Sequence, residues 1–356
     1  LADAGVTLVE RRGEIAALAP EPIVRVGDRT LAADHLVVAV GARPRRPSWC
    51  GPGTPVVTAD AFYLSDDPLP ERLVVLGGDD VAVGLAGLAR ALGIAVTLVF
   101  TEHEPLGGFD DDLRAHVGAA LLGAGVRLRP HTRVGAVVAG TQRHAVETDA
   151  GVIAADRVVL AGAAPPSPDA ARLGLDRFGV PVTPEGAVYV DTRYAARVPG
   201  LFAIGDAADH AGHGLAPGTF DYATVAAAEG RRLAEHLAGR TPPPLDYDRA
   251  PLAAAGRPEV ASLGFGEARA RALGFAVATA GGTGAEGGFV KLVAEPAGEL
   301  LGCHLAGPGA GAAIRRVAAI LDETATPAAV AAALRGHETP ATALTEELVA
   351  RLGELS

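Results

Sequence analysis

The segment from Arg72 to Phe100, RLVVLGGDDVAVGLAGLARALGIAVTLVF, has the residue types that can bind a diphosphate on backbone amides. In a G-x-G-x-x-G turn the first glycine makes the tight bend and the second lets the backbone approach the pyrophosphate. The third glycine lets the helix pack closely on the strand. Here these positions hold Gly77, Asp79 and Ala82, and alanine is tolerated at the third.

Asp79 is the unfavourable residue in this turn, because it adds bulk and a negative charge where a diphosphate binds. Two like unit charges about 4 Å apart repel by roughly 1 to 4 kcal/mol, depending on the local dielectric. The acidic residue that would hold a ribose at the end of the second strand is also missing, since Phe100 stands there and Glu102 lies beyond it. We expect weak or no dinucleotide binding, and a unit kept for packing alone is an equally open interpretation.

The stretch LFAIGDAADH carries a second candidate site, at Gly205 and Asp206. An apolar strand that ends in Gly-Asp puts a carboxylate just past the carboxyl end of a buried strand, where it can accept hydrogen bonds from a polyol. Because Gly-Asp pairs are common in ordinary turns, this signal is weak when taken alone.

The elements that must position these residues follow from hydrophobic periodicity. Apolar strands are predicted at 73–76 and 96–100, with an apolar-faced helix at about 81–92 between them, which together form a βαβ unit. Further buried strands are predicted at 36–40 and 201–204, and a helix at 111–122. From Gly288 the pattern predicts a two-stranded hairpin, a helix and two more short helices.

Composition excludes several classes of function. The 356 residues carry 31 Lys and Arg against 42 Asp and Glu, a net charge of −11 without a basic cluster, which argues against nucleic acid or an anionic membrane as partner. The apolar runs are shorter than the roughly 20 residues that span a bilayer.

Cys50 and Cys303 imply no disulfide framework, and a cytoplasmic compartment is predicted. The DHAGHG cluster is expected to be a solvated loop, and no metal site is predicted.

Seven motifs resemble, in order and spacing, the class I pyridine nucleotide-disulfide oxidoreductases, the flavoproteins similar to dihydrolipoyl dehydrogenase, mercuric reductase and glutathione reductase. The resemblance covers essentially the whole chain, and seven motifs in one order are more specific than any single one. The motifs are DHLVVAVGARPRRP, RLVVLGGDDVAVGLA, VPGLFAIGDAADH, VAAAEGRRLAEHL, RPEVASLGF, GFVKLVAEPAGELLGCHLAGPGAG and HETPATALTEEL.

The resemblance implies an α/β fold in which a split, incomplete FAD-binding domain receives an inserted NAD(P)-binding βαβ domain and an α+β dimerisation domain follows. We expect the later part of the first FAD segment at 1–66, the NAD(P)-type domain at 67–163, the returning FAD segment at 164–247 and the dimerisation domain at 248–356. A homodimer built mainly through the last domain is therefore expected.

The resemblance also assigns residues to FAD and to NAD(P)H. Asp206, with Gly205, corresponds to the family residue that binds the flavin ribityl chain, and Gly41 follows a strand that packs near the cofactor. A degenerate NAD(P) site falls on four further residues: Gly77, Gly78, Ala82 and Gly162.

The family's catalytic acid–base dyad is matched only by its histidine, at His337. Thr342 stands five residues later, where the orienting Glu is expected, and without that carboxylate the imidazolium is stabilised less. Gly84 replaces a helix Glu that in the family lies close to the flavin. The resemblance places the family's first glycine-rich FAD turn and its redox cysteine pair before Leu1, so we expect an N-terminally truncated sequence, as the absence of Met also suggests.

The function implied by the resemblance is electron transfer from NAD(P)H through FAD to a disulfide, quinone or metal-ion acceptor. The sequence does not distinguish among these acceptors. The alternative is a non-catalytic homologue that keeps the fold as a structural or binding dimer.

Overall fold

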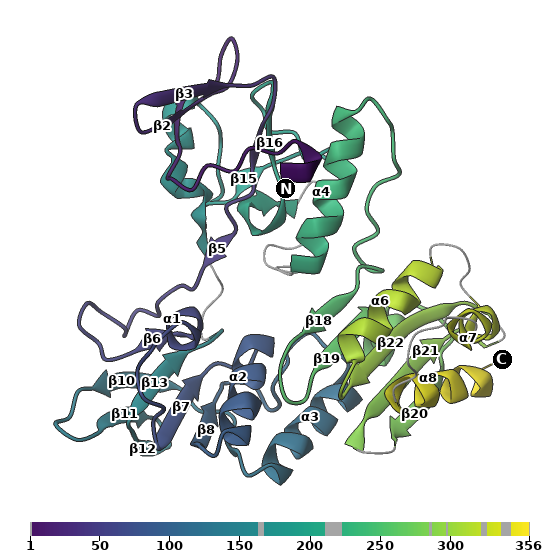
Figure 1. Ribbon diagram of the computed structural model, residues 1–356. Helices are drawn as coiled ribbons and strands as arrows, with labels where there is room; N and C mark the ends of the chain where they lie inside the picture. The colour runs from purple at the N-terminus through teal and green to yellow at the C-terminus, as the bar shows by residue number, and fades with distance from the viewer. Residues whose placement is uncertain are drawn as a thin grey trace. The chain divides into compact units, whose positions relative to one another are not determined.

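The computed structural model describes residues 2–162, 167–210, 223–284, 287–296, 298–321, 326–335 and 343–355. The chain divides into two compact units, the first formed by residues 1–43 and 166–245 and the second by residues 44–165 and 246–356. Each unit has its own buried apolar core. Figure 1 shows the elements of both units.

A parallel sheet of five strands, in the order β6-β13-β7-β8-β9, forms the first part of the second unit. Three helices follow strands of this sheet along the chain (Figure 1). The bounds are β6 (Val57–Thr58), α1 (Ala59–Tyr63), β7 (Arg72–Leu76), α2 (Asp80–Ala91), β8 (Ala95–Val99), α3 (Asp111–Gly123), β9 (Arg127–Arg129) and β13 (Arg157–Leu160).

Strand β7 is buried on both faces, which explains its unbroken apolar sequence. Alternate side chains point to opposite faces of a sheet. Leu73 and Val75 belong to the core that includes α2 and α3, whereas Val74 and Leu76 pack in a core shared with a three-stranded meander. The meander consists of β10 (Val134–Val138), β11 (His144–Thr148) and β12 (Gly151–Ala155).

An antiparallel sheet of five strands, in the order β18-β19-β22-β21-β20, forms the rest of the second unit. Its core is shared with the last three helices of the chain. The bounds are β18 (Leu252–Ala254), β19 (Val260–Gly264), α5 (Glu267–Ala272), β20 (Ala278–Thr283), β21 (Phe289–Ala294), β22 (Leu300–Ala306), α6 (Ala310–Leu321), α7 (Pro327–Arg335) and α8 (Ala343–Glu354).

The first unit contains small sheets and one long helix, and its core includes Val38 and Leu201. Strand β4 pairs in parallel with β16, in which Ala203 is the partner of Val38, so residues 165 positions apart in the sequence meet here. The bounds are β1 (Glu14–Ala17), β2 (Ile23–Val26), β3 (Arg29–Ala32), β4 (Leu36–Val38), β5 (Ala42–Arg43), β14 (Ser167–Pro168), β15 (Val188–Tyr189), β16 (Leu201–Ala203), β17 (Ala208–Asp209) and α4 (Ala223–Leu237). Short 3-10 helices lie at Ala2–Ala4, Asp169–Leu173, Leu175–Phe178 and Gly205–Ala207.

The βαβ unit predicted from periodicity is confirmed as β7, α2 and β8, with bounds shifted by about one residue. The hairpin predicted from Gly288 is β21 and β22, but the sequence reasoning missed β18, β19 and β20. Strand β20 contains Gly281 and Gly282, which have low strand propensity, and its pairing with β21 overrides that preference. Among the described residues, no helix has the length and apolar character needed to cross a membrane.

Lys291 on β21 connects the two sheets of the second unit electrostatically. Its Nζ atom lies 2.6 Å from Asp112 Oδ2, 3.1 Å from Asp110 Oδ1 and 3.0 Å from Glu267 Oε2. Asp110 also accepts hydrogen bonds from the amides of Asp112 and Glu267, at the start of α3 and α5. Burial alone would lower the pKa of Lys291, but its hydrogen bonds to the three carboxylates raise it above the ordinary value.

We predict that Lys291→Met lowers the free energy of unfolding by about 3–5 kcal/mol, because it removes the cation that three carboxylates share, one of which, Asp110, is buried. Arg249→Met removes the exposed ion pair with Glu299 and should change stability by less than about 1 kcal/mol. Urea denaturation of the two variants measures the difference. Equal, small effects would show that the cluster does not hold the sheets together.

Candidate functional site

The Gly205–Asp206 turn lies at the carboxyl end of the parallel β4–β16 pair. Ile204 continues the pairing beyond β16, since its amide donates to Val38 O at 3.1 Å. Gly205 adopts a φ of +60°, in the left-handed region that favours glycine. A Cβ at this position would lie 3.0 Å from the Ala226 Cβ atom on α4, so glycine also permits close helix packing.

Gly41 and Asp206 lie at the same end of the strand pair. Gly41 follows β4 with a φ of +66°, and a Cβ added there would meet no atom within 4 Å. Asp206 is partly buried, and this burial raises the pKa of its carboxyl, with the charge of Glu229 acting in the same sense. The structure therefore places two predicted residues that are 165 positions apart at the same end of one strand pair, with open space at Gly41.

A fully buried carboxylate on α4 supports this turn. Glu229 has no exposed surface, accepts a hydrogen bond from the Gly205 amide at 2.6 Å and lies 2.7 Å from His210 Nε2 through its other oxygen. Sequence reasoning missed Glu229, although Val225, Glu229 and Leu233 follow the four-residue spacing of one helix face. A Glu in the middle of such an apolar stripe was the available signal.

His210 is therefore not in the solvated loop that the sequence analysis expected. Its side chain is only 11% exposed, because it pairs with Glu229. His213, the other histidine of that cluster, lies outside the described residues.

The glycine turn predicted from RLVVLGGDDVA lies between β7 and α2 in the second unit. Asp79 is the N-cap of α2, and its Oδ1 atom accepts a hydrogen bond from the Ala82 amide at 2.9 Å. Gly77 has a φ of +133°, and a Cβ there would lie 1.4 Å from the carbonyl oxygen of Ala161. The ends of the neighbouring strands β7 and β13 thus meet at the turn.

The four residues of the degenerate NAD(P) site do lie close together. Gly78 follows Gly77 in the turn, Ala82 is on the first turn of α2, and Gly162 follows β13. A Cβ at Gly162 would lie 1.8 Å from Asp79 Oδ2, so the Asp79 carboxylate rests against the Gly162 backbone.

Gly84 and Gly87 give α2 a second, structural role. A Cβ at Gly84 would lie 2.4 Å from Ala255 O, and one at Gly87 would lie 1.6 Å from Arg257 O. The backbone around Gly256 therefore packs directly on the helix, which explains why Gly84 cannot be a larger residue in this structure.

His337 and Thr342, the predicted remnants of an acid–base dyad, lie outside the described residues. Cys50 and Cys303 are both buried and unbridged. Burial raises the pKa of the Cys303 thiol, which makes it an unreactive core residue.

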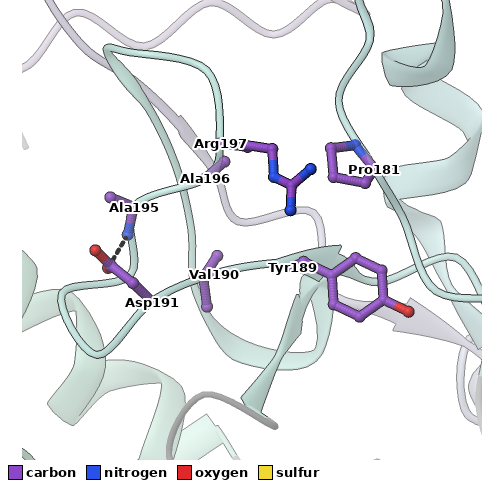
Figure 2. A pocket seen from close by; sticks show the side chains of 7 residues that line it. All are labelled: Pro181, Tyr189, Val190, Asp191, Ala195, Ala196 and Arg197. Carbon is purple, nitrogen blue, oxygen red and sulfur yellow. Dashed lines mark hydrogen bonds between the residues drawn. The ribbon is translucent and has the colours of Figure 1, made fainter.

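The first unit also has an open hollow of about 550 Å³. Figure 2 shows the Arg197 guanidinium pointing between Pro181 and the ring of Tyr189. Asp191 closes the adjacent turn, because its Oδ1 atom accepts the Ala195 amide at 2.9 Å. The residues that line the hollow include none of the predicted site residues.

Comparison with known families gives two matches. Residues 2–230 match the family described as pyridine nucleotide-disulphide oxidoreductase, and residues 250–348 match the dimerisation domain of the same family.

Curated relatives align over almost the whole chain. A glutathione reductase from Burkholderia cepacia is 30% identical over 98% of this chain and 76% of its own length. A dihydrolipoyl dehydrogenase from Halobacterium salinarum is 29% identical over 98% of this chain and 75% of its own length. The crystal structure of LpdA from Mycobacterium tuberculosis has the same fold, with a TM-score of 0.81, 24% identity and coverage of 100% of this chain and 78% of that one.

We predict that Glu229→Ala lowers the free energy of unfolding of the first unit by about 2–4 kcal/mol, because it removes the acceptor of the Gly205 amide and the buried carboxylate that pairs with His210. Glu229→Gln keeps an acceptor and should cost less. The control is Glu235→Ala, further along α4, where the side chain is partly exposed. Thermal unfolding compares the three variants, and equal effects of Glu229→Ala and Glu235→Ala would contradict the supporting role.

Proposed function

We infer that the chain, which belongs to the pyridine nucleotide-disulphide oxidoreductase family, is an FAD-dependent oxidoreductase that passes two electrons from a reduced donor, which in the family is NAD(P)H, through FAD to a disulfide, quinone or metal-ion acceptor. Family membership confirms the resemblance seen in the seven sequence motifs and the expected α/β class. Members of the family depend on FAD and use NAD(P)H. The acceptor is the part of the proposal that the sequence leaves open.

The observation that carries this proposal is Asp206 at the carboxyl end of the β4–β16 pair. Ligands of α/β folds bind beyond the carboxyl ends of parallel strands. A partly buried carboxylate is a strong acceptor for hydroxyl groups, and the neighbouring Gly41 leaves its side-chain space empty. These residues fit the hydroxyl-rich ribityl chain of a flavin.

In this arrangement each residue has a distinct role. Asp206 would accept hydrogen bonds from the flavin ribityl hydroxyls, while Glu229 fixes the Gly205 amide and so orients the turn. Gly41 would allow the cofactor to approach the backbone. When bound, FAD supplies the two-electron chemistry, and the protein supplies binding and orientation.

The glycine turn of the second unit does not fit NAD(P)H in the same way. The Asp79 carboxylate already caps α2, where a pyrophosphate would bind. No residue of this turn is therefore assigned to NAD(P)H. The same observation favours the second candidate function, a non-catalytic homologue that keeps the fold as a structural or binding dimer.

The domain boundaries also remain part of the proposal. We assign 1–66 and 164–247 to an FAD-type domain, 67–163 to an NAD(P)-type domain and 248–356 to dimerisation, although β6, at Val57–Thr58, pairs with β13 of the NAD(P)-type domain. Residues 250–348 match the family's dimerisation domain, which supports a two-fold symmetric homodimer. His337 would then act in acid–base chemistry, with Thr342 in place of an orienting carboxylate.

We predict that Asp206→Ala weakens FAD binding by roughly 10- to 100-fold, the range for one lost hydrogen bond to a charged group. Asp28→Ala, in the exposed turn between β2 and β3, is the matched control and should leave FAD affinity unchanged. Titration with FAD, followed by quenching of flavin fluorescence, measures both. Unchanged affinity in Asp206→Ala would remove the main support for the flavin site.

We also predict a homodimer in solution. Light scattering at micromolar concentration should give twice the mass of one chain, because the dimerisation domain pairs with its own copy. A monomer across this range would contradict the proposed homodimer.

A further inference from the structure

The N-terminus of α2 is occupied by a side chain of the protein itself. A helix N-terminus attracts anions, because its first amides have no partner within the helix and its dipole is positive there. In dinucleotide-binding domains the pyrophosphate meets this need. Here the Asp79 carboxylate meets it, through the hydrogen bond to the Ala82 amide at 2.9 Å.

The Asp79 carboxylate also fills the space between the strands. Strand β7 has β13 as one neighbour and β8 as the other, so the chain changes direction across the sheet at β7. Ligands of such sheets enter at this point. Asp79 Oδ2 lies against Gly162 at the end of β13, within 1.8 Å of where a Cβ would stand.

Apolar side chains cover the other half of the same turn. Phe100, only 3% exposed, follows β8, and its Cβ lies 3.0 Å from where a Cβ of Gly78 would stand. The amide of the fully buried Leu106 donates to Gly78 O at 2.6 Å. The end of β8 therefore packs an apolar ring where a ribose would need an acidic acceptor, and the carboxylate near this turn is Glu102, whose Oε2 atom lies 3.5 Å from where a Cβ of Gly78 would stand.

From these contacts we propose that the Asp79 carboxylate occupies the anion position at the start of α2 and thereby excludes NAD(H) and NADP(H) from the nucleotide-binding-type domain. This domain serves instead to support the antiparallel sheet by packing against it. The second role follows from Gly84 and Gly87, which hold the 255–257 backbone against α2. The inference does not depend on the flavin site, because Asp79 and Asp206 belong to different units.

The first experiment separates the charge of Asp79 from its bulk. NAD⁺ is titrated at pH 7.5 into the wild type, Asp79→Asn and Asp79→Gly, with calorimetry as the readout. Asp79→Asn keeps the volume and the N-cap acceptor, so the helix start is preserved, and it removes only the charge. Asp80→Asn is the control, since it neutralises the adjacent carboxylate, which is not the N-cap.

We expect the wild type to bind NAD⁺ only weakly, with a Kd above about 1 mM, and Asp79→Asn and Asp79→Gly to bind it at least about tenfold more tightly. Asp80→Asn should change the affinity by less than about threefold. Adding Phe100→Glu to Asp79→Gly should raise the affinity further, because it supplies an acceptor for the ribose. Circular dichroism confirms that each variant is folded.

Acidification provides a second readout on the unmodified chain. Burial raises the pKa of Asp79 to about 6, so its negative charge is lost as the pH falls below that value. The other titratable groups near this edge are Asp80, Glu102, and the rings of His103 and His131, which lie 3.2 Å apart. Because Asp79→Asn leaves these other groups in place, the rise in NAD⁺ affinity from pH 7.5 to 5.5 must be larger in the wild type than in Asp79→Asn.

Three results would overturn the proposal. The first is micromolar NAD⁺ binding by the wild type at pH 7.5. The second is a folded Asp79→Asn and a folded Asp79→Gly that gain no affinity, which would show that Asp79 is not the excluding group. The third is an equal pH dependence in the wild type and Asp79→Asn.

Discussion

The amides at the start of helix α2 need an acceptor, and the identity of that acceptor determines what the second unit can bind. In a dinucleotide site the acceptor is the ligand, so the helix start remains incomplete until the ligand arrives. Here the acceptor is Asp79, which belongs to the chain. The amide of Ala82 at the start of the helix therefore has its acceptor in the free protein. The neighbouring residues pack around this arrangement, with Gly162 against the Asp79 carboxylate and Phe100 and Leu106 against Gly78.

The first unit shows the opposite arrangement around its own turn. The Gly205 amide donates a hydrogen bond to the buried Glu229 carboxylate. The Asp206 side chain can therefore bind a ligand at the end of the β4–β16 pair. Both units thus use a carboxylate to fix a glycine turn after a parallel strand. In the first unit this carboxylate is Glu229, which belongs to helix α4 and not to the turn. In the second unit it is Asp79, which occupies the position where a ligand anion would bind.

The sequence indicated the elements well where burial is periodic. Strands β7 and β8 were predictable because they are apolar on both faces, and helix α2 was predictable because it is apolar along one side. The clash at Asp79 was also visible, but its role as an N-cap was not recognised, although an Asp directly before a helix is a known capping signal.

Other parts of the site depend on contacts between distant segments. Lys291 forms ion pairs with Asp110 and Asp112, which lie about 180 positions earlier in the sequence, and no local sequence pattern predicts such a pairing. Strand β20, with its two adjacent glycines, exists because β21 pairs with it. Glu229 could have been found from its place among Val225 and Leu233, but its partner Gly205 could not.

The central claim is that Asp79, and not a ligand, occupies the anion position of α2. The most direct test is a crystal structure of the unmodified protein grown at pH 7.5 with several millimolar NAD⁺. We predict that the Asp79 carboxylate remains bonded to the Ala82 amide and that no pyrophosphate lies on the Gly77–Ala82 turn. A pyrophosphate bound there, with Asp79 turned away from the helix, would contradict the account.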